Sequence, residues 1–171
     1  MNKARIITTL QCTRHCKLCS NKMLRVETKA VWCKLTDIGN YDEYILTGGE
    51  PLIDIGRIID IAWHLKNEHP RSEIYLYTTL FSMHSMDELM KYIDGITYSV
   101  HVPFLSSDRY HFMNMQNFAN RHPNKSFRLW IDQHVNGYLE IRPADWDRIT
   151  VAPMLKDCKL PEDEQLFILE D

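Results

Sequence analysis

The sequence predicts an α/β protein with a mostly parallel sheet, because strand-like and helix-like segments alternate along its 171 residues. Hydrophobic residues make up 44% of the chain, which is enough for one buried core. No linker-like composition or internal repeat divides the chain, so we expect a single domain over residues 1–171. In such a fold the ligand site lies beyond the carboxyl ends of the strands.

Six segments rich in β-branched and aromatic residues are expected to be strands: 4–10, 43–47, 73–79, 96–102, 127–132 and 149–153. Helices are expected between them at about 54–67, 85–94 and 107–120. Asp54 is the expected cap of the first helix, and Ser85 with Glu88 has the spacing of a capping box for the second. The acidic residues at 162–164 and 170–171 are expected to form a solvated tail.

Charge and hydropathy give no indication of a nucleic-acid or membrane partner. The 20 Lys and Arg residues against 23 Asp and Glu residues give a net charge of -3, and no basic cluster forms a clear nucleic-acid surface. No apolar run approaches the roughly 20 residues of a membrane helix, and the first residues lead into a strand without a signal-peptide core. We therefore expect a cytoplasmic protein without a membrane partner.

Two motifs follow the first two predicted strands. Cys12, Cys16 and Cys19 lie within the stretch LQCTRHCKLCSNK, and Gly48-Gly49-Glu50-Pro51 ends the second strand. Five cysteines, an odd number clustered near one end, suit metal binding in a reducing compartment better than a disulfide framework. The glycines allow close backbone approach or positive φ, Glu50 brings a carboxylate, and the proline sets the exit from the turn.

The number of cysteines leaves two kinds of metal site open. A structural zinc site is usually closed by four ligands, so it would have to recruit Cys33, Cys158 or His15. An iron–sulfur cube also ordinarily takes four cysteines, but three would leave one iron free to bind a small molecule.

The order C-x3-C-x2-C, then a strand ending in Gly-Gly-Glu-Pro about thirty residues later, resembles the radical S-adenosylmethionine (radical SAM) superfamily. The resemblance implies a partial (βα)6 barrel covering most of the chain, with its carboxyl-end mouth open toward cofactor and substrate. It also implies a [4Fe-4S] cluster on Cys12, Cys16 and Cys19, whose open iron binds S-adenosylmethionine. An external electron donor such as flavodoxin or ferredoxin would reduce that cluster.

The resemblance assigns further roles residue by residue. The Glu50 carboxylate and the Gly48-Gly49 backbone, in the turn that ends at Pro51, would receive the ammonium group of S-adenosylmethionine. Ser99 resembles the position that reaches the ribose or carboxylate of the cofactor. Thr78 and Thr79 match more weakly, and the alternative for all three hydroxyls is strand pairing and loop capping.

Polar side chains within otherwise apolar strands indicate a polar barrel lumen. Thr97, Ser99 and His101 share one face of their strand, and Arg128, Trp130 and Asp132 share a face of another. Our hypothesis is that His101, Arg128 and Asp132 line the substrate end. The alternative is that Arg128 and Asp132 lie at strand ends in solvent.

Three functions remain open from sequence. The first is an enzyme in which a 5′-deoxyadenosyl radical abstracts hydrogen from a small-molecule or nucleobase-precursor substrate, and Trp130 with the polar lumen favours it. The second is an activase that installs a glycyl radical on a partner protein, because Cys19-Ser20-Asn21 resembles the C-x-N run of some activases. The third is a non-catalytic binding module stabilised by zinc or a cluster.

Overall fold

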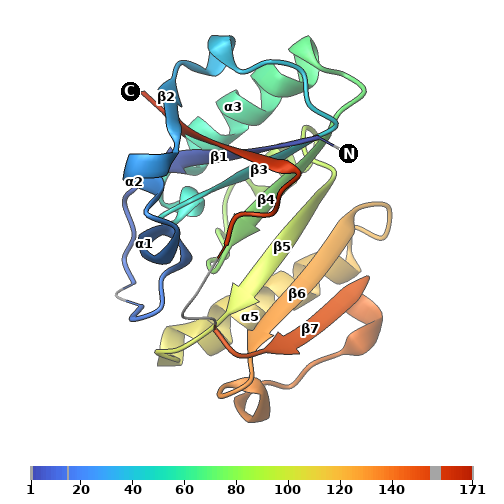
Figure 1. Cartoon of the computed structure of the whole chain (residues 1–171). Coiled ribbons are helices and arrows are strands. Elements are labelled where there is room, and N and C mark those ends of the chain that lie inside the picture. The colour runs from blue at the N-terminus through green and yellow to red at the C-terminus, as the bar shows by residue number, and fades with distance from the viewer. Residues whose placement is uncertain (1, 15, 155–158, 171) are drawn as a thin grey trace.

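The strands join into one parallel sheet in the computed structural model, which describes residues 2–14, 16–154 and 159–170 (Figure 1). The strands are β1 (Lys3–Thr9), β2 (Val31–Cys33), β3 (Glu43–Gly48), β4 (Glu73–Thr78), β5 (Gly95–Val100), β6 (Ser126–Asp132), β7 (Arg148–Ala152) and β8 (Glu164–Leu169). The α-helices are α1 (Ser20–Leu24), α2 (Val26–Lys29), α3 (Ile55–Glu68), α4 (Met86–Leu89) and α5 (Ser106–Asn120). Short 3-10 turns are η1 (Leu35–Asp37), η2 (Pro51–Asp54), η3 (Asn136–Tyr138) and η4 (Pro143–Asp145).

The sheet has the strand order β2-β8-β1-β3-β4-β5-β6-β7, and every neighbouring pair within it is parallel. The predicted α/β class and parallel sheet are confirmed. The sheet is open, with β2 and β7 at its edges, and it has eight described strands where the sequence predicted six. A curved open sheet of this kind is compatible with a partial barrel.

One face of the sheet is covered by α3, α4 and α5, whose buried residues form one core with the strands, and Figure 1 shows α5 behind β5 and β6. Alternate strand residues such as Ile6, Leu46, Leu76 and Tyr98 point into this layer and are essentially inaccessible to solvent. The period of two along parallel strands therefore explains the main core. Asp54 accepts a hydrogen bond from the Arg57 backbone N–H at 3.0 Å and caps α3 as predicted.

The other face carries a second, smaller apolar cluster at its β1–β8 end. Leu24 at the end of α1 and Val26 at the start of α2 pack there with Ile7, Leu166 and Ile168. Residues two apart point to different sides of one helix, so burying both requires a break at residue 25. The chain therefore forms two short helices, which the sequence analysis did not predict.

Two local predictions were wrong. The predicted solvated tail is wrong at Glu164, which pairs with Arg5 at 2.6 Å, and the apolar residues 166–169 of β8 that follow it are buried between β1 and β2. Glu162, Asp163 and Glu170 are exposed as predicted, and Asp171 lies outside the described residues. Acidic residues flank a buried apolar run there, and the charge pattern concealed it. Ser85 adopts φ 65° and its side chain does not cap α4, so the capping-box spacing is not used.

Gly95, at the start of β5, provides a test of the sheet packing. A Cβ at this position would lie 2.2 Å from the carbonyl oxygen of Ser126 on β6. We expect Gly95→Ala to lower the free energy of unfolding by about 1–3 kcal/mol, since the neighbouring backbone must move. Gly39→Ala is the control, because a Cβ there meets nothing within 4 Å. Urea unfolding of both variants is the measurement, and equal losses would contradict the packing.

Candidate functional site

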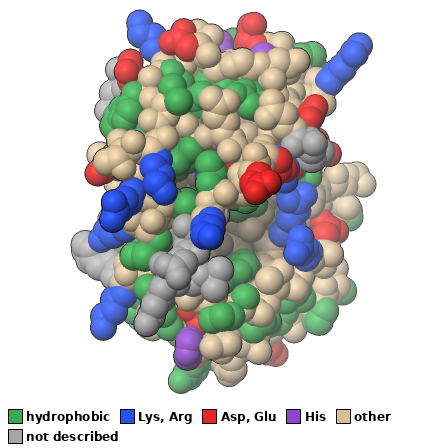
Figure 2. Space-filling model, in the orientation of Figure 1, with side chains coloured by type: hydrophobic (Ala, Val, Ile, Leu, Met, Phe, Trp, Pro, Cys, Tyr) green, Lys and Arg blue, Asp and Glu red, His purple; other side chains and the backbone are tan. Residues whose placement is uncertain are grey.

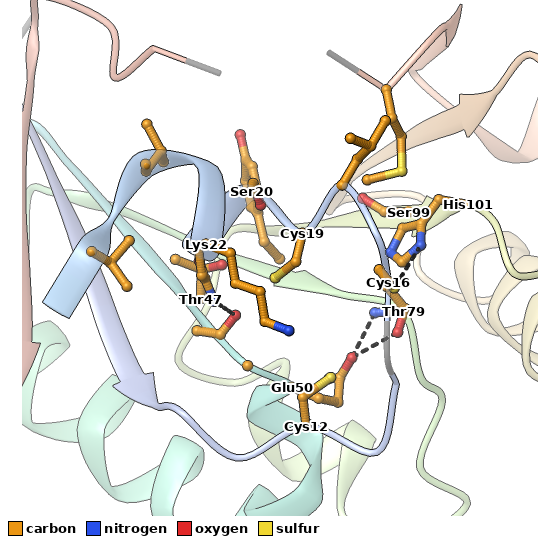
Figure 3. A pocket seen from close by; sticks show the side chains of 18 of the residues that line it. Cys12, Cys16, Cys19, Ser20, Lys22, Thr47, Glu50, Thr79, Ser99 and His101 are labelled. Carbon is orange, nitrogen blue, oxygen red and sulfur yellow. Dashed lines mark hydrogen bonds between the residues drawn. The ribbon is translucent and has the colours of Figure 1, made fainter. Parts of the chain in front are cut away.

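A cavity of about 900 Å³ opens at the carboxyl ends of the strands (Figure 3). It lies on the face of the sheet opposite α3 and α5, between the α1–α2 segment and the connection from β7 to β8. Its lining includes all three motif cysteines and the Gly48-Gly49-Glu50 turn. The two sequence motifs, separated by some thirty residues, therefore meet at one site.

The three cysteines are free thiols that border this cavity from different depths. Cys16 is buried, Cys19 is half-buried just before α1, and Cys12 is exposed at the loop after β1. Burial raises the pKa of the Cys12 thiol, opposed by a hydrogen bond from the backbone N–H of Arg14, and the charges of Glu50 and the other two cysteines raise it further. Three thiolates here would repel one another, so a cationic partner would stabilise them.

The two glycines pack against the backbone of the cysteine loop. Gly48 has φ 147°, and a Cβ there would lie 2.3 Å from the carbonyl oxygen of Thr9. A Cβ on Gly49 would lie 2.0 Å from the carbonyl oxygen of Gln11. The N–H of Gly49 donates to Thr9 O at 2.7 Å, and the N–H of Glu50 donates to Gln11 O at 2.8 Å. The close approach that the glycines allow is thus to the cysteine loop itself.

The Glu50 carboxylate is buried and surrounded by donors from the protein. Its Oε1 accepts hydrogen bonds from the Thr78 hydroxyl at 2.5 Å and the Leu52 N–H at 3.1 Å. Its Oε2 accepts from both the N–H and the hydroxyl of Thr79 at 2.9 Å (Figure 3). Four donors fill the usual acceptor capacity of a carboxylate. Glu50 therefore joins the turn before Pro51 to the end of β4, and the two threonines act as its partners.

Arg14, inside the cysteine loop, is anchored to the far side of the site. Its guanidinium pairs with Asp108 of α5 and donates to the carbonyl oxygens of His101 at 3.1 Å and Pro103 at 2.5 Å. Both side chains of the ion pair are 5% exposed. Burial alone would lower the pKa of Arg14, but Asp108, and then Cys16, raise it above its ordinary value.

His101 contacts the most buried cysteine. Its Nδ1 lies 3.4 Å from the Cys16 sulfur (Figure 3). Burial, and then the nearby Arg14 charge, lower the pKa of His101 below its ordinary value, which favours the neutral imidazole. His101 and Arg14 are therefore the polar neighbours of Cys16, and such neighbours tune and orient a metal-bound sulfur.

The remaining predicted site residues are divided between the cavity and the sheet below it. Ser99 and Trp130 line the cavity together with His101. Arg128 lies lower on the same face, with its guanidinium 4.0 Å from the Tyr75 ring centre. Asp132 is buried and accepts from the His134 backbone N–H at 2.9 Å. The lining of the cavity includes neither Arg128 nor Asp132.

The sequence analysis did not single out Arg5 and Lys22 of the cavity lining, and it noted Asn21 only for its resemblance to the C-x-N run of activases. Asn21 donates a side-chain hydrogen bond to the Gly48 carbonyl, and Arg5 lies over the Tyr77 ring at 5.2 Å. Lys22 extends into the cavity from α1 (Figure 3). The spacing of Asn21 from Cys19 was a usable signal, whereas the placement of Arg5 depends on pairing with β8, which was not predicted.

The donor set fits a cluster better than a single ion. Among the described residues, no three Cys, His, Asp or Glu side chains gather as one metal ion requires. Thiolates around a cube of four irons stand farther apart than thiolates around one zinc, so three cysteines spread about a shared cavity fit the larger group. Of the residues that could complete a zinc site, Cys33 lies in β2 outside the cavity lining, and Cys158 and His15 lie outside the described residues.

This fold and site define an iron–sulfur protein of the α/β class. The chain belongs to the 4Fe-4S single cluster domain family, whose model matches residues 5–122 and so more than half of the chain. No match was found among curated proteins. Within the described residues, none of the helices has the length and apolar character needed to cross a membrane.

The buried Arg14–Asp108 pair gives a stability prediction. We expect Asp108→Asn to lower the free energy of unfolding of the cluster-free protein by about 3–5 kcal/mol, because it leaves a buried guanidinium without its counter-charge. Lys91→Gln, which breaks the exposed Lys91–Glu88 pair, is the control and should change stability little. The free energies of unfolding of both variants are measured in urea. A similarly small loss in Asp108→Asn and Lys91→Gln would contradict the anchoring role of Arg14.

Glu43, on the same face of the sheet but below the cavity, gives a pH prediction. Burial raises the pKa of this carboxyl, against the opposing effects of Lys3 and Arg128. Folding then disfavours the charged form of Glu43. Burial of this carboxylate therefore lowers the free energy of unfolding once the pH rises above the ordinary carboxyl pKa. We expect Glu43→Gln to be more stable than the unsubstituted chain at pH 7, with the gain shrinking toward pH 4. Urea unfolding at both pH values measures this, and a gain that grows on acidification would contradict it.

Proposed function

We propose that this protein is a radical SAM enzyme that acts on a small molecule. The observation that carries the proposal is the meeting of three free cysteines and the Gly48-Gly49 turn at one cavity. Three protein thiolates on a four-iron cluster leave one iron open, and the adjoining turn and cavity offer space and backbone groups for a ligand of that iron. Cys12, Cys16 and Cys19 would hold the cluster.

When bound, the reduced cluster would pass one electron to the sulfonium of S-adenosylmethionine, releasing methionine and a 5′-deoxyadenosyl radical that takes a hydrogen atom from the substrate. The protein supplies position and shielding. Arg14 and His101 are the polar neighbours of Cys16, and Glu50 holds the turn against β4. Since the Glu50 carboxylate is filled by protein donors, backbone carbonyls of the turn are the better acceptors for the cofactor ammonium. Ser99 remains a candidate contact for its ribose or carboxylate.

The walls of the cavity favour a small substrate over a partner protein. Residues on the α1–α2 segment face the cavity from one side, and Pro153, Met154 and residues 159–161 line it from the β7–β8 connection. A cavity bounded on both sides suits a molecule that enters it. The Asn21 side chain, which suggested an activase, has a local role in holding Gly48. An external donor such as flavodoxin or ferredoxin would supply the electron in the cytoplasm, where clustered thiols stay reduced.

The test is anaerobic reconstitution with iron and sulfide, followed by EPR of the reduced protein with and without S-adenosylmethionine and an assay for 5′-deoxyadenosine. We expect a cube-type signal that changes on adding the cofactor, together with deoxyadenosine. Cys12→Ser, Cys16→Ser and Cys19→Ser should each lose the cluster and the product, while Cys33→Ser should retain both because it lies outside the cavity lining. Bound zinc, or a cluster unaffected by the cofactor, would overturn the proposal.

A further inference from the structure

Two segments that border the cavity carry positive charge that the cluster site does not account for. Lys22 and Arg25 on the α1–α2 segment, and Lys159 on the β7–β8 connection, all line the cavity and have exposed side chains. We call these three residues the basic wall. Figure 2 shows Lys and Arg side chains on both sides of the hollow on this face.

Within the described residues, no member of the basic wall forms an ion pair. The other cations of the lining differ, because Arg5 pairs with Glu164 and Arg14 pairs with Asp108. The acidic residues of the lining are Glu27 and Glu50, and Glu50 is already filled by protein donors. The three cations of the wall therefore outnumber Glu27, the other acidic side chain of the described lining, and present net positive charge to whatever enters the cavity.

Arg25 is held in a conformation that its residue type disfavours. It has φ 52° and ψ 51°, the left-handed region, which a non-glycine residue occupies at a cost of roughly 1–2 kcal/mol. The burial of Leu24 and Val26 on either side forces the chain to break there and turns the Arg25 side chain toward the cavity. Glycine would satisfy this backbone without strain, so a glycine substitution removes the Arg25 guanidinium without a backbone penalty.

We infer that the basic wall binds the phosphate of a phosphorylated small-molecule substrate. Three cations drawn from two chain segments match a group of multiple negative charge better than a single carboxylate such as that of S-adenosylmethionine. The phosphate would lie at the wall, and the rest of the molecule would extend over Trp130 and Ser99 toward the cysteines. That this ligand is a substrate rests on the proposed function, but its binding does not.

The test is calorimetric titration of the cluster-free protein with inorganic pyrophosphate. We expect binding that weakens as salt is added and that is about tenfold weaker or more in Lys22→Gln and Arg25→Gly. Lys29→Gln is the matched control. It removes the same charge from the neighbouring helix α2, but Lys29 does not line this cavity. Arg25→Gly should unfold at a urea concentration no lower than that of the unsubstituted chain, since glycine relieves the strained backbone.

Three results would overturn the inference: absence of pyrophosphate binding, an equal loss in Lys29→Gln, or a lower unfolding midpoint for Arg25→Gly, which would make Arg25 structural. A fourth arm uses the reconstituted protein, where S-adenosylmethionine should leave pyrophosphate binding unchanged. Displacement of pyrophosphate by S-adenosylmethionine would show that the basic wall binds the cofactor and is not a substrate site. Because the first titrations need neither cluster nor turnover, they can succeed or fail independently of cofactor cleavage.

Discussion

The close contact between the Gly48-Gly49 turn and the chain after β1 is the constraint on which the site depends. The parallel pairing of β1 with β3 ends in a shift of register at these residues, and the turn continues the contact through backbone hydrogen bonds to Thr9 and Gln11. Side chains on either glycine would overlap carbonyl oxygens. The start of the cysteine loop is thus held as an extension of the sheet, which gives a loop the rigidity of a strand.

Buried charges hold the rest of the loop in place. Arg14 reaches Asp108 across 94 residues of sequence, and the same Asp108 accepts from the backbone N–H of Leu105 at the start of α5. Glu50 similarly joins its turn to the end of β4. Buried ionic groups are costly unless every donor and acceptor is used, and these two nearly meet that condition. The exception is the Arg14 Nε–H, which is buried and has no hydrogen-bond partner within the described residues.

Sequence patterns predicted the parts of the fold that follow regular periods. The strands β1 and β3 to β7, and the cap of α3 at Asp54, were predicted from apolar and β-branched runs and from the capping residue. The α1–α2 break and β8 did not, because each is determined by burial against a distant strand. At the site, the motifs predicted which residues meet. They did not predict the hydrogen bonds from Thr78 and Thr79 to the Glu50 carboxylate or the Arg14–Asp108 ion pair, because the partners in these contacts lie far away in the sequence. Arg128 shows the same limit, since its polar strand position placed it on the correct face but not at the depth of the cavity.

The family match separates the segment that carries the cysteines from part of the cavity wall. The family match ends at residue 122, so it contains the cysteines, the Gly48-Gly49 turn, Glu50 and Arg14. Trp130 on β6, the lining residues of the β7–β8 connection and the strand β8 lie beyond it. The later strands complete the sheet on both edges, since β8 returns to pair with β1 while β6 and β7 extend the other side. Changes in these outer walls can therefore alter what enters the cavity while the contacts that position the cysteines stay the same.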